Sequence, residues 1–298
     1  MKNDHEQRAT PIPEDRTASA TQLLIDQSIR AINQSGGITA HTVNIYESQP
    51  APGPAQSGAG QPVLFPGTTP KNGPARFRAP GEPIGIRDDL LAGIDNSVSL
   101  SAGPALWLRL MPASDPGKMW TPYELAMERG RGLGLQPFQW GTPTGHGGLY
   151  TLRAEDGVGS CSLITPEAGE TDSVAFALET GEVWAIDTAL LMAEPGYLLP
   201  GMIEDLCTAR LPEYARFLGN IGLNPPYRWI AGVIGVKDRL LHPPRMYVPT
   251  WRGLKCLSEI ITALGNYDGN QTPTSALLPF FRAMYEKSGI PRPDYLPM

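Results

Sequence analysis

The amino-acid sequence predicts an α+β fold, with a mixed and largely antiparallel sheet flanked by helices. The predicted elements follow one another as strand, helix, two hairpins, helix, strands and helix, an order typical of α+β domains and different from the regular alternation of a doubly wound sheet. The chain has 33 Gly and 31 Pro among 298 residues, which excludes a coiled coil or a helical array. Its 41% of hydrophobic residues is enough for a packed core.

Two segments of different composition precede the linker and the predicted domain. Residues 1–20 are polar and charged with almost no large apolar side chain, so we expect them to be disordered. Residues 21–48 are predicted to form an interaction arm, in which the spacing of Ile25, Ile29 and Ile32 gives a short helix one apolar stripe.

The arm continues as a β-branched run over residues 38–46, which predicts one strand. Residues 49–84 are rich in Pro and Gly and are predicted to be a flexible linker. A lone helix and strand bury too little surface to be stable alone, and this strand has no Lys or Pro to protect its edge. We therefore expect residues 21–46 to drive self-association into a homo-oligomer, with a different protein partner as the alternative.

The α+β domain is predicted to span residues 85–298. Alternating leucines predict a strand over 105–111, and Thr121-Pro122-Tyr123-Glu124 is a capping box with Pro at the first helical position, which predicts a helix of about ten residues. Asp156-Gly157 and Thr180-Gly181 each predict a hairpin turn. The other predicted elements are strands at 148–154, 158–165, 173–179, 183–186, 227–236 and 246–248, a helix over 203–221 kinked or split at Pro212 and ended by Gly222, and a helix over 274–287 ended by Gly289.

Charge, cysteine spacing and motifs argue against several classes of function. A formal net charge of −6 with only 18% charged residues argues against nucleic acid as a partner. Cys161, Cys207 and Cys256 lie far apart without a CxxC pair, so we expect free thiols and no metal site. Nucleotide-binding and metal-binding motifs are missing, so no cofactor is expected. The sequence has neither a signal peptide nor a membrane-spanning run, which predicts a cytoplasmic protein without membrane contact.

The best sequence candidate for a site is the loop over residues 140–150. There Trp140, His146 and Gly147 combine a titratable ring with residues that allow close backbone approach, and we expect them to bind a ligand. As an alternative, Cys161 could act as a nucleophile with His146 as base and Asp156 as the orienting carboxylate. Strand alternation favours a buried, inert Cys161 instead.

Four stretches of the domain carry a family resemblance. They are Ala105-Leu-Trp-Leu-Arg-Leu-Met-Pro112, the hairpin from Phe176 to Asp187, the helix with Leu211-Pro-Glu-Tyr-Ala-Arg-Phe-Leu218, and the run from Pro225 to Lys237. Together, over roughly residues 100–295, they resemble the region after the DNA-binding module of bacterial Schlafen/AlbA-type proteins. That module is replaced here by the arm and linker, so the resemblance implies no catalytic residue. Residues 33–45 resemble short Gly-Gly-Ile-Thr-Ala runs of uncharacterised bacterial proteins.

The sequence thus predicts a non-enzymatic binding or sensor module with an arm for self-association. The resemblance implies an accessory domain of a bacterial system, in a stress or phage-defence setting. The alternatives are a Cys/His-dependent hydrolase and a nucleic-acid-binding accessory protein.

Overall fold

The computed structural model describes residues 81–87, 97–131, 135–138, 149–163, 169–242, 253–294 and 296–297. All of them belong to one compact unit of the chain. The predicted disordered segment, the arm, nearly all of the linker and the strand expected at 246–248 lie outside the described residues. The first strand starts at Pro83, two residues before the predicted start of the domain.

Nine strands form one sheet in the order β11-β9-β3-β7-β6-β2-β1-β4-β5, and every pair in it is antiparallel except β2 with β6. Two short strands, β8 and β10, form a separate parallel pair. The predicted α+β class with a mixed, largely antiparallel sheet is therefore confirmed. The strands are β1 Pro83–Arg87, β2 Ser97–Leu100, β3 Ala105–Pro112, β4 Leu149–Ala154, β5 Gly157–Leu163, β6 Glu170–Leu178, β7 Glu182–Asp187, β8 Tyr197–Leu198, β9 Tyr227–Ile234, β10 Leu240–Leu241 and β11 Ile260–Tyr267.

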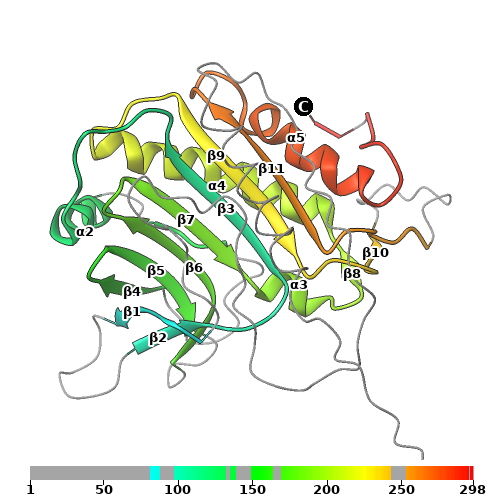
Figure 1. The fold of residues 1–298 in the computed structure, drawn as a ribbon, viewed down its shortest axis with the longest axis horizontal. Coiled ribbons are helices and arrows are strands. Elements are labelled where there is room, and N and C mark those ends of the chain that lie inside the picture. The colour runs from blue at the N-terminus through cyan, green and yellow to red at the C-terminus, as the bar shows by residue number, and fades with distance from the viewer. Residues whose placement is uncertain are drawn as a thin grey trace, which may run out of the picture. The chain divides into compact units, whose positions relative to one another are not determined.

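One end of the sheet closes on itself. Strand β5 pairs with β4 and also along the length of β6, while β6 pairs through its first residues with β2. Strands β6, β5, β4, β1 and β2 therefore make a closed ring, and β7, β3, β9 and β11 extend from it as an open sheet (Figure 1). Closure leaves the ring without a free edge, which in β proteins removes a site of unwanted pairing.

Helices lie on one face of the sheet. They are α2 Pro122–Arg131, which packs against β5 of the ring and against α4, and α3 Ala189–Ala193, α4 Pro200–Asn220 and α5 Pro273–Glu286, which cover the open sheet. The larger hydrophobic core lies between them and the sheet, and it includes Leu106, Leu108 and Leu110 of β3. A second core, with Trp107, Phe176 and Trp184, lies on the opposite face where the ring curls over it.

Local sequence signals explain several of these elements. Thr121 and Glu124 form the predicted capping box, because the Thr121 amide donates to the Glu124 carboxylate at 2.8 Å and the Glu124 amide donates to the Thr121 hydroxyl at 3.2 Å. The ten-residue α2 that follows confirms the predicted helix. Helix α4 is one continuous helix through Pro212, so of the two predicted outcomes, a kink or a split, the split does not occur.

Three aromatic rings each lie over a glycine of the neighbouring strand. Trp107 is directly opposite Gly232, Trp229 opposite Gly265 and Phe176 opposite Gly159. A Cβ atom on these glycines would come within 2.3 to 2.6 Å of the facing ring. The rings fill the space that a side chain would need, and this fixes which residues can face one another.

We expect Gly232→Ala to destabilise the fold by about 3 kcal/mol, because the new methyl group meets both the Trp107 ring and the Ile261 carbonyl oxygen. Gly196→Ala is the matched control, since its Cβ would meet no atom within 4 Å, and it should change stability by less than about 0.5 kcal/mol. Urea unfolding followed by tryptophan fluorescence measures both. Equal stability of the two variants would contradict the packing argument.

Candidate binding site

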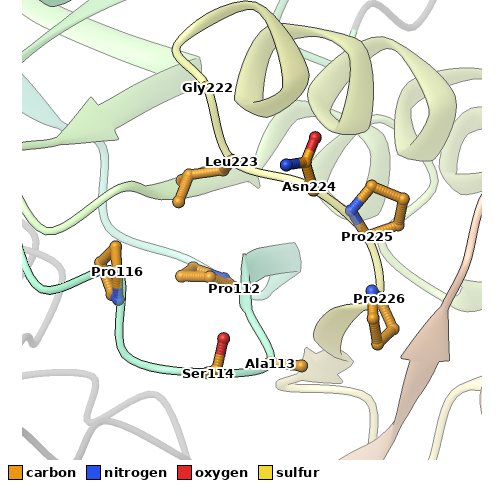
Figure 2. A pocket seen from close by; sticks show the side chains of 9 residues that line it. All are labelled: Pro112, Ala113, Ser114, Pro116, Gly222, Leu223, Asn224, Pro225 and Pro226. Carbon is orange, nitrogen blue, oxygen red and sulfur yellow. The ribbon is translucent and has the colours of Figure 1, made fainter.

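A groove opens where the end of β3 meets the loop between α4 and β9 (Figure 2). Its volume is about 420 Å³. We call it the proline groove, and it is lined by Pro112, Ala113, Ser114, Pro116, Gly222, Leu223, Asn224, Pro225 and Pro226.

Main-chain and side-chain hydrogen bonds hold the two walls of the groove together. The Ala113 amide donates to the Pro226 carbonyl at 3.2 Å and continues the β3–β9 ladder. The Trp120 indole donates to the Ile221 carbonyl at 3.1 Å, just before the groove wall begins at Gly222. Gly222 ends α4 with a φ of +90°, a left-handed conformation that favours glycine and turns the chain into the groove wall.

The groove is suited to binding rather than to proton transfer. None of its nine lining residues carries an ionisable side chain. Most of them are Pro, Ala or Gly, which lose almost no side-chain entropy when they are covered. Ser114 and Asn224 supply the polar side chains.

An exposed apolar stripe follows the groove along the chain. Met119, Tyr123 and Met127 are spaced four residues apart and are 60%, 73% and 45% exposed. Leu125, on the other side of α2, is fully buried in the larger core. Tyr123 and Met127 lie one turn apart on α2, and Met119 lies in the segment just before that helix. Exposed apolar side chains that lie close together on a protein surface mark docking sites.

The structure separates two of the three residues of the predicted thiol site, Cys161 and Asp156. Cys161 is fully buried in the second core, on the opposite face of β5 from Val158, as the strand alternation predicts. Asp156 lies in the turn before β5, five residues and about 16 Å along the strand from Cys161. Trp140, His146 and Gly147 lie outside the described residues, so their role as ligand-binding residues stays a prediction. The structure therefore does not bring Cys161 and Asp156 together.

None of the three cysteines forms a disulfide, and all three are buried. Burial raises the pKa of the Cys207 thiol far above its ordinary value, and the nearby Glu204 carboxylate adds to this. Burial also raises the pKa of Cys256. A thiolate at neutral pH is thus disfavoured at both positions.

Asp187 is the buried acid with the clearest change in its proton affinity. It ends β7 between Leu106 and Ser173, and its Oδ1 accepts a 2.8 Å hydrogen bond from the Leu190 amide in the first turn of α3. Its Oδ2 has no partner among the described residues. Burial raises the pKa of Asp187 to about 7, against the opposing effect of the Leu190 amide and the Ser173 hydroxyl.

Within the described part of the chain, no three His, Cys, Asp or Glu side chains gather closely enough to hold a metal ion. None of the described helices combines the length and the apolar character needed to cross a membrane.

Comparison of the chain with protein-family models, with curated proteins and with solved structures finds no match. The resemblance to Schlafen/AlbA-type proteins therefore stays a prediction, as do the bacterial setting and the arm. The proline groove combines residues 112–116 and 222–226, and sequence reasoning did not single it out, because no local signal joins segments so far apart.

We expect the stability of the protein to fall as pH rises from about 4 to 7 through Asp187. In that range the unfolded chain carries an ionised Asp187 and the folded chain a protonated one, so folding takes up a proton; above pH 7 both states are ionised and the effect levels off. In Asp187→Asn the amide oxygen can still accept from Leu190. The free energy of unfolding of this variant, measured against that of wild type, should rise by on the order of 3–4 kcal/mol between pH 4 and pH 8.

Urea unfolding at each pH unit from 4 to 8 measures the difference between wild type and Asp187→Asn. Glu155→Gln, at an exposed position, is the control for the loss of one carboxylate. If the difference in free energy of unfolding between wild type and Asp187→Asn does not change with pH, Asp187 does not have a raised pKa in the folded protein.

Proposed function

We propose that the domain is a non-enzymatic binding module that docks an uncharged, apolar peptide segment of a partner protein. The segment lies in the proline groove and against Met119, Tyr123 and Met127. The observation that carries the proposal is the exposure of these three side chains beside a groove without ionisable groups.

The chemistry of the surface supports this type of ligand. Methionine side chains are flexible and polarisable and adapt to different apolar partners, while tyrosine combines a large contact area with a hydroxyl that stays solvated at the rim. Prolines lack an amide N–H, so the groove walls present carbonyl oxygens and apolar rings. A peptide backbone can supply N–H donors to those carbonyls while its apolar side chains cover the rings.

The position of the stripe supports the same function. Trp120 packs beside Leu223, since a Cβ on Gly181 would contact both side chains at 2.8 Å. Trp120 therefore joins the groove wall at Leu223 to the segment that leads into α2, and Met119 and Tyr123 are close to Trp120 in the sequence.

The proposal is tested with peptides selected on the full-length protein from a random displayed library, whose affinities are then measured by fluorescence titration. We expect Tyr123→Ala to lower the affinity for the tightest-binding peptide by at least 10-fold, because central aromatic residues dominate apolar interfaces. Alanine suits an exposed helical position, so this variant should fold normally. Leu257→Ala is the matched control, because Leu257 is as exposed as Tyr123, at 73%, and lies outside the stripe.

Two results would refute this site. The first is that Tyr123→Ala and Leu257→Ala bind the selected peptide equally well. The second is that selection yields only charged peptides whose affinity falls with salt, which would indicate an electrostatic surface elsewhere.

A further inference from the structure

Strand β11 is the one strand of the described nine-stranded sheet that has a neighbour on a single side. Each other strand of that sheet pairs on two sides, because the ring closes through β5 with β6 and β2 with β6. Strand β11 pairs with β9 alone. The sheet therefore has one open edge.

The sequence of β11 offers none of the usual protection for such an edge. Its eight residues, Ile-Ile-Thr-Ala-Leu-Gly-Asn-Tyr, include no charged residue and no proline. Its register with β9 runs without a bulge from Ile260 to Tyr267. Long, regular and uncharged edge strands are templates for pairing with another chain.

Two hydrogen bonds show which residues of β11 direct their backbone groups away from β9. The Gly235 amide donates to the Glu259 carbonyl at 3.0 Å, so the odd-numbered residues face β9. The Gln271 side chain donates to the Asn266 carbonyl at 2.7 Å, which agrees with even-numbered residues facing outward. By the alternation of an antiparallel strand, Ile260, Thr262 and Leu264 then present an N–H and a C=O at the open edge.

The side chains of these three residues lie on the face that the helices do not cover. Ile260 is opposite Ile234 and Leu264 is opposite Ile230, and all four are half-buried. Ile234 and Ile260 pack against the margin of the second core on this face. Here the last two strands carry apolar pairs up to the open edge.

We propose that two copies of this chain pair through β11 about a two-fold axis at Thr262. In this register Thr262 is opposite Thr262 of the second copy, and Ile260 is opposite Leu264 of the second copy. The three outward-facing residues of each strand then face one another, and each pair exchanges two N–H···O hydrogen bonds.

Side-chain chemistry fits this register. Ile260 and Leu264 of the two copies make apolar cross-strand pairs, and a threonine pair is a favourable neighbour across antiparallel strands. Glu259 faces Gly265 of the second copy, so no two acids are opposed.

The two-fold arrangement also stops at two copies. Each copy contributes the same surface, which makes the contact isologous and closed. Because the other end of each sheet closes as a ring, no described strand of the joined sheet is left with one whole side unpaired. Strand addition at this edge yields a defined dimer and not a fibre.

The test uses the full-length protein in sedimentation experiments from 1 to 300 µM. Thr262→Pro removes an N–H that points away from β9, so it breaks the edge without removing a hydrogen bond of the sheet. Leu264→Lys places a charge beside the same edge. We expect wild type to form a concentration-dependent dimer and both variants to weaken it by at least 10-fold.

Two further variants separate this edge from other modes of association. Met192→Lys is the control for adding a lysine at an exposed apolar side chain, since Met192 is 54% exposed on α3, and it should dimerise as wild type does. Ile29→Lys disrupts the apolar stripe of the predicted arm. It should also leave the dimer intact, because this proposal assigns self-association to the β11 edge in place of the arm that the sequence suggests.

Amide hydrogen exchange gives a second readout that needs no variant. Raising the protein concentration should slow exchange at Ile260, Thr262 and Leu264 and leave Ile261 and Ala263 unchanged, because only the first three face the second copy. If Thr262→Pro fails to fold, the Leu264→Lys variant and this exchange pattern still show whether the dimer forms through β11. A monomer at every concentration, a mass above the dimer, or a dimer lost in Ile29→Lys and kept in Leu264→Lys would overturn the proposal.

Discussion

The packing of aromatic rings over glycines on neighbouring strands is the constraint on which the sheet depends. Trp107 and Phe176 lie in the second core, and Trp229 lies in the larger core under the helices. Because each ring needs the glycine opposite it, a shift of one residue between β3 and β9 would place a side chain under Trp107. The pairs fix the register of three ladders, and the register determines where β3 and β9 end and so where the proline groove opens.

Charged side chains inside the protein join segments that are far apart in the sequence. Arg292 makes a two-bond ion pair with Glu204, at 3.0 and 2.6 Å, and so attaches the residues after α5 to α4. Arg239 donates to the carbonyls of Leu191 in α3 and of Glu194 and Tyr197 after it, while Asp187 accepts from the first turn of that helix. A five-residue helix is too short to be stable alone, so these contacts from outside hold it.

Much of the fold could be predicted from local sequence signals, and the parts that could not depend on distant contacts. The capping box at Thr121, the hairpin turns and the Gly222 end of α4 are each encoded within a few residues. Strand β11 was not predicted, because Ala263 and Gly265 interrupt its β-branched pattern and its place is set by packing on Trp229. The parallel pairing of β2 with β6 closes the ring through residues about seventy positions apart.

In the candidate site, too, features encoded by neighbouring residues could be predicted from the sequence, and features that depend on distant contacts could not. The sequence pointed to Trp140, His146 and Gly147, chosen for residue type within one loop, and this loop lies outside the described residues. The proline groove has no motif of its own, because its two walls meet only after β3 pairs with β9. Burial of Cys161 could be foreseen from strand alternation, since that pattern is local.

The position of β3 between β7 and β9 has a consequence for synthesis in the cell. Strand β3 ends at Pro112, and its partner β9 starts at Tyr227. At the usual rate of translation, about 5–20 residues per second, the ribosome needs roughly 6–23 s to reach β9 after completing β3. Strand β7, the other neighbour of β3, is made earlier, so during the rest of that time β3 is paired on one side and has an apolar, unpaired edge on the other. The nascent chain therefore passes through a stage in which this edge is open to pairing with other chains.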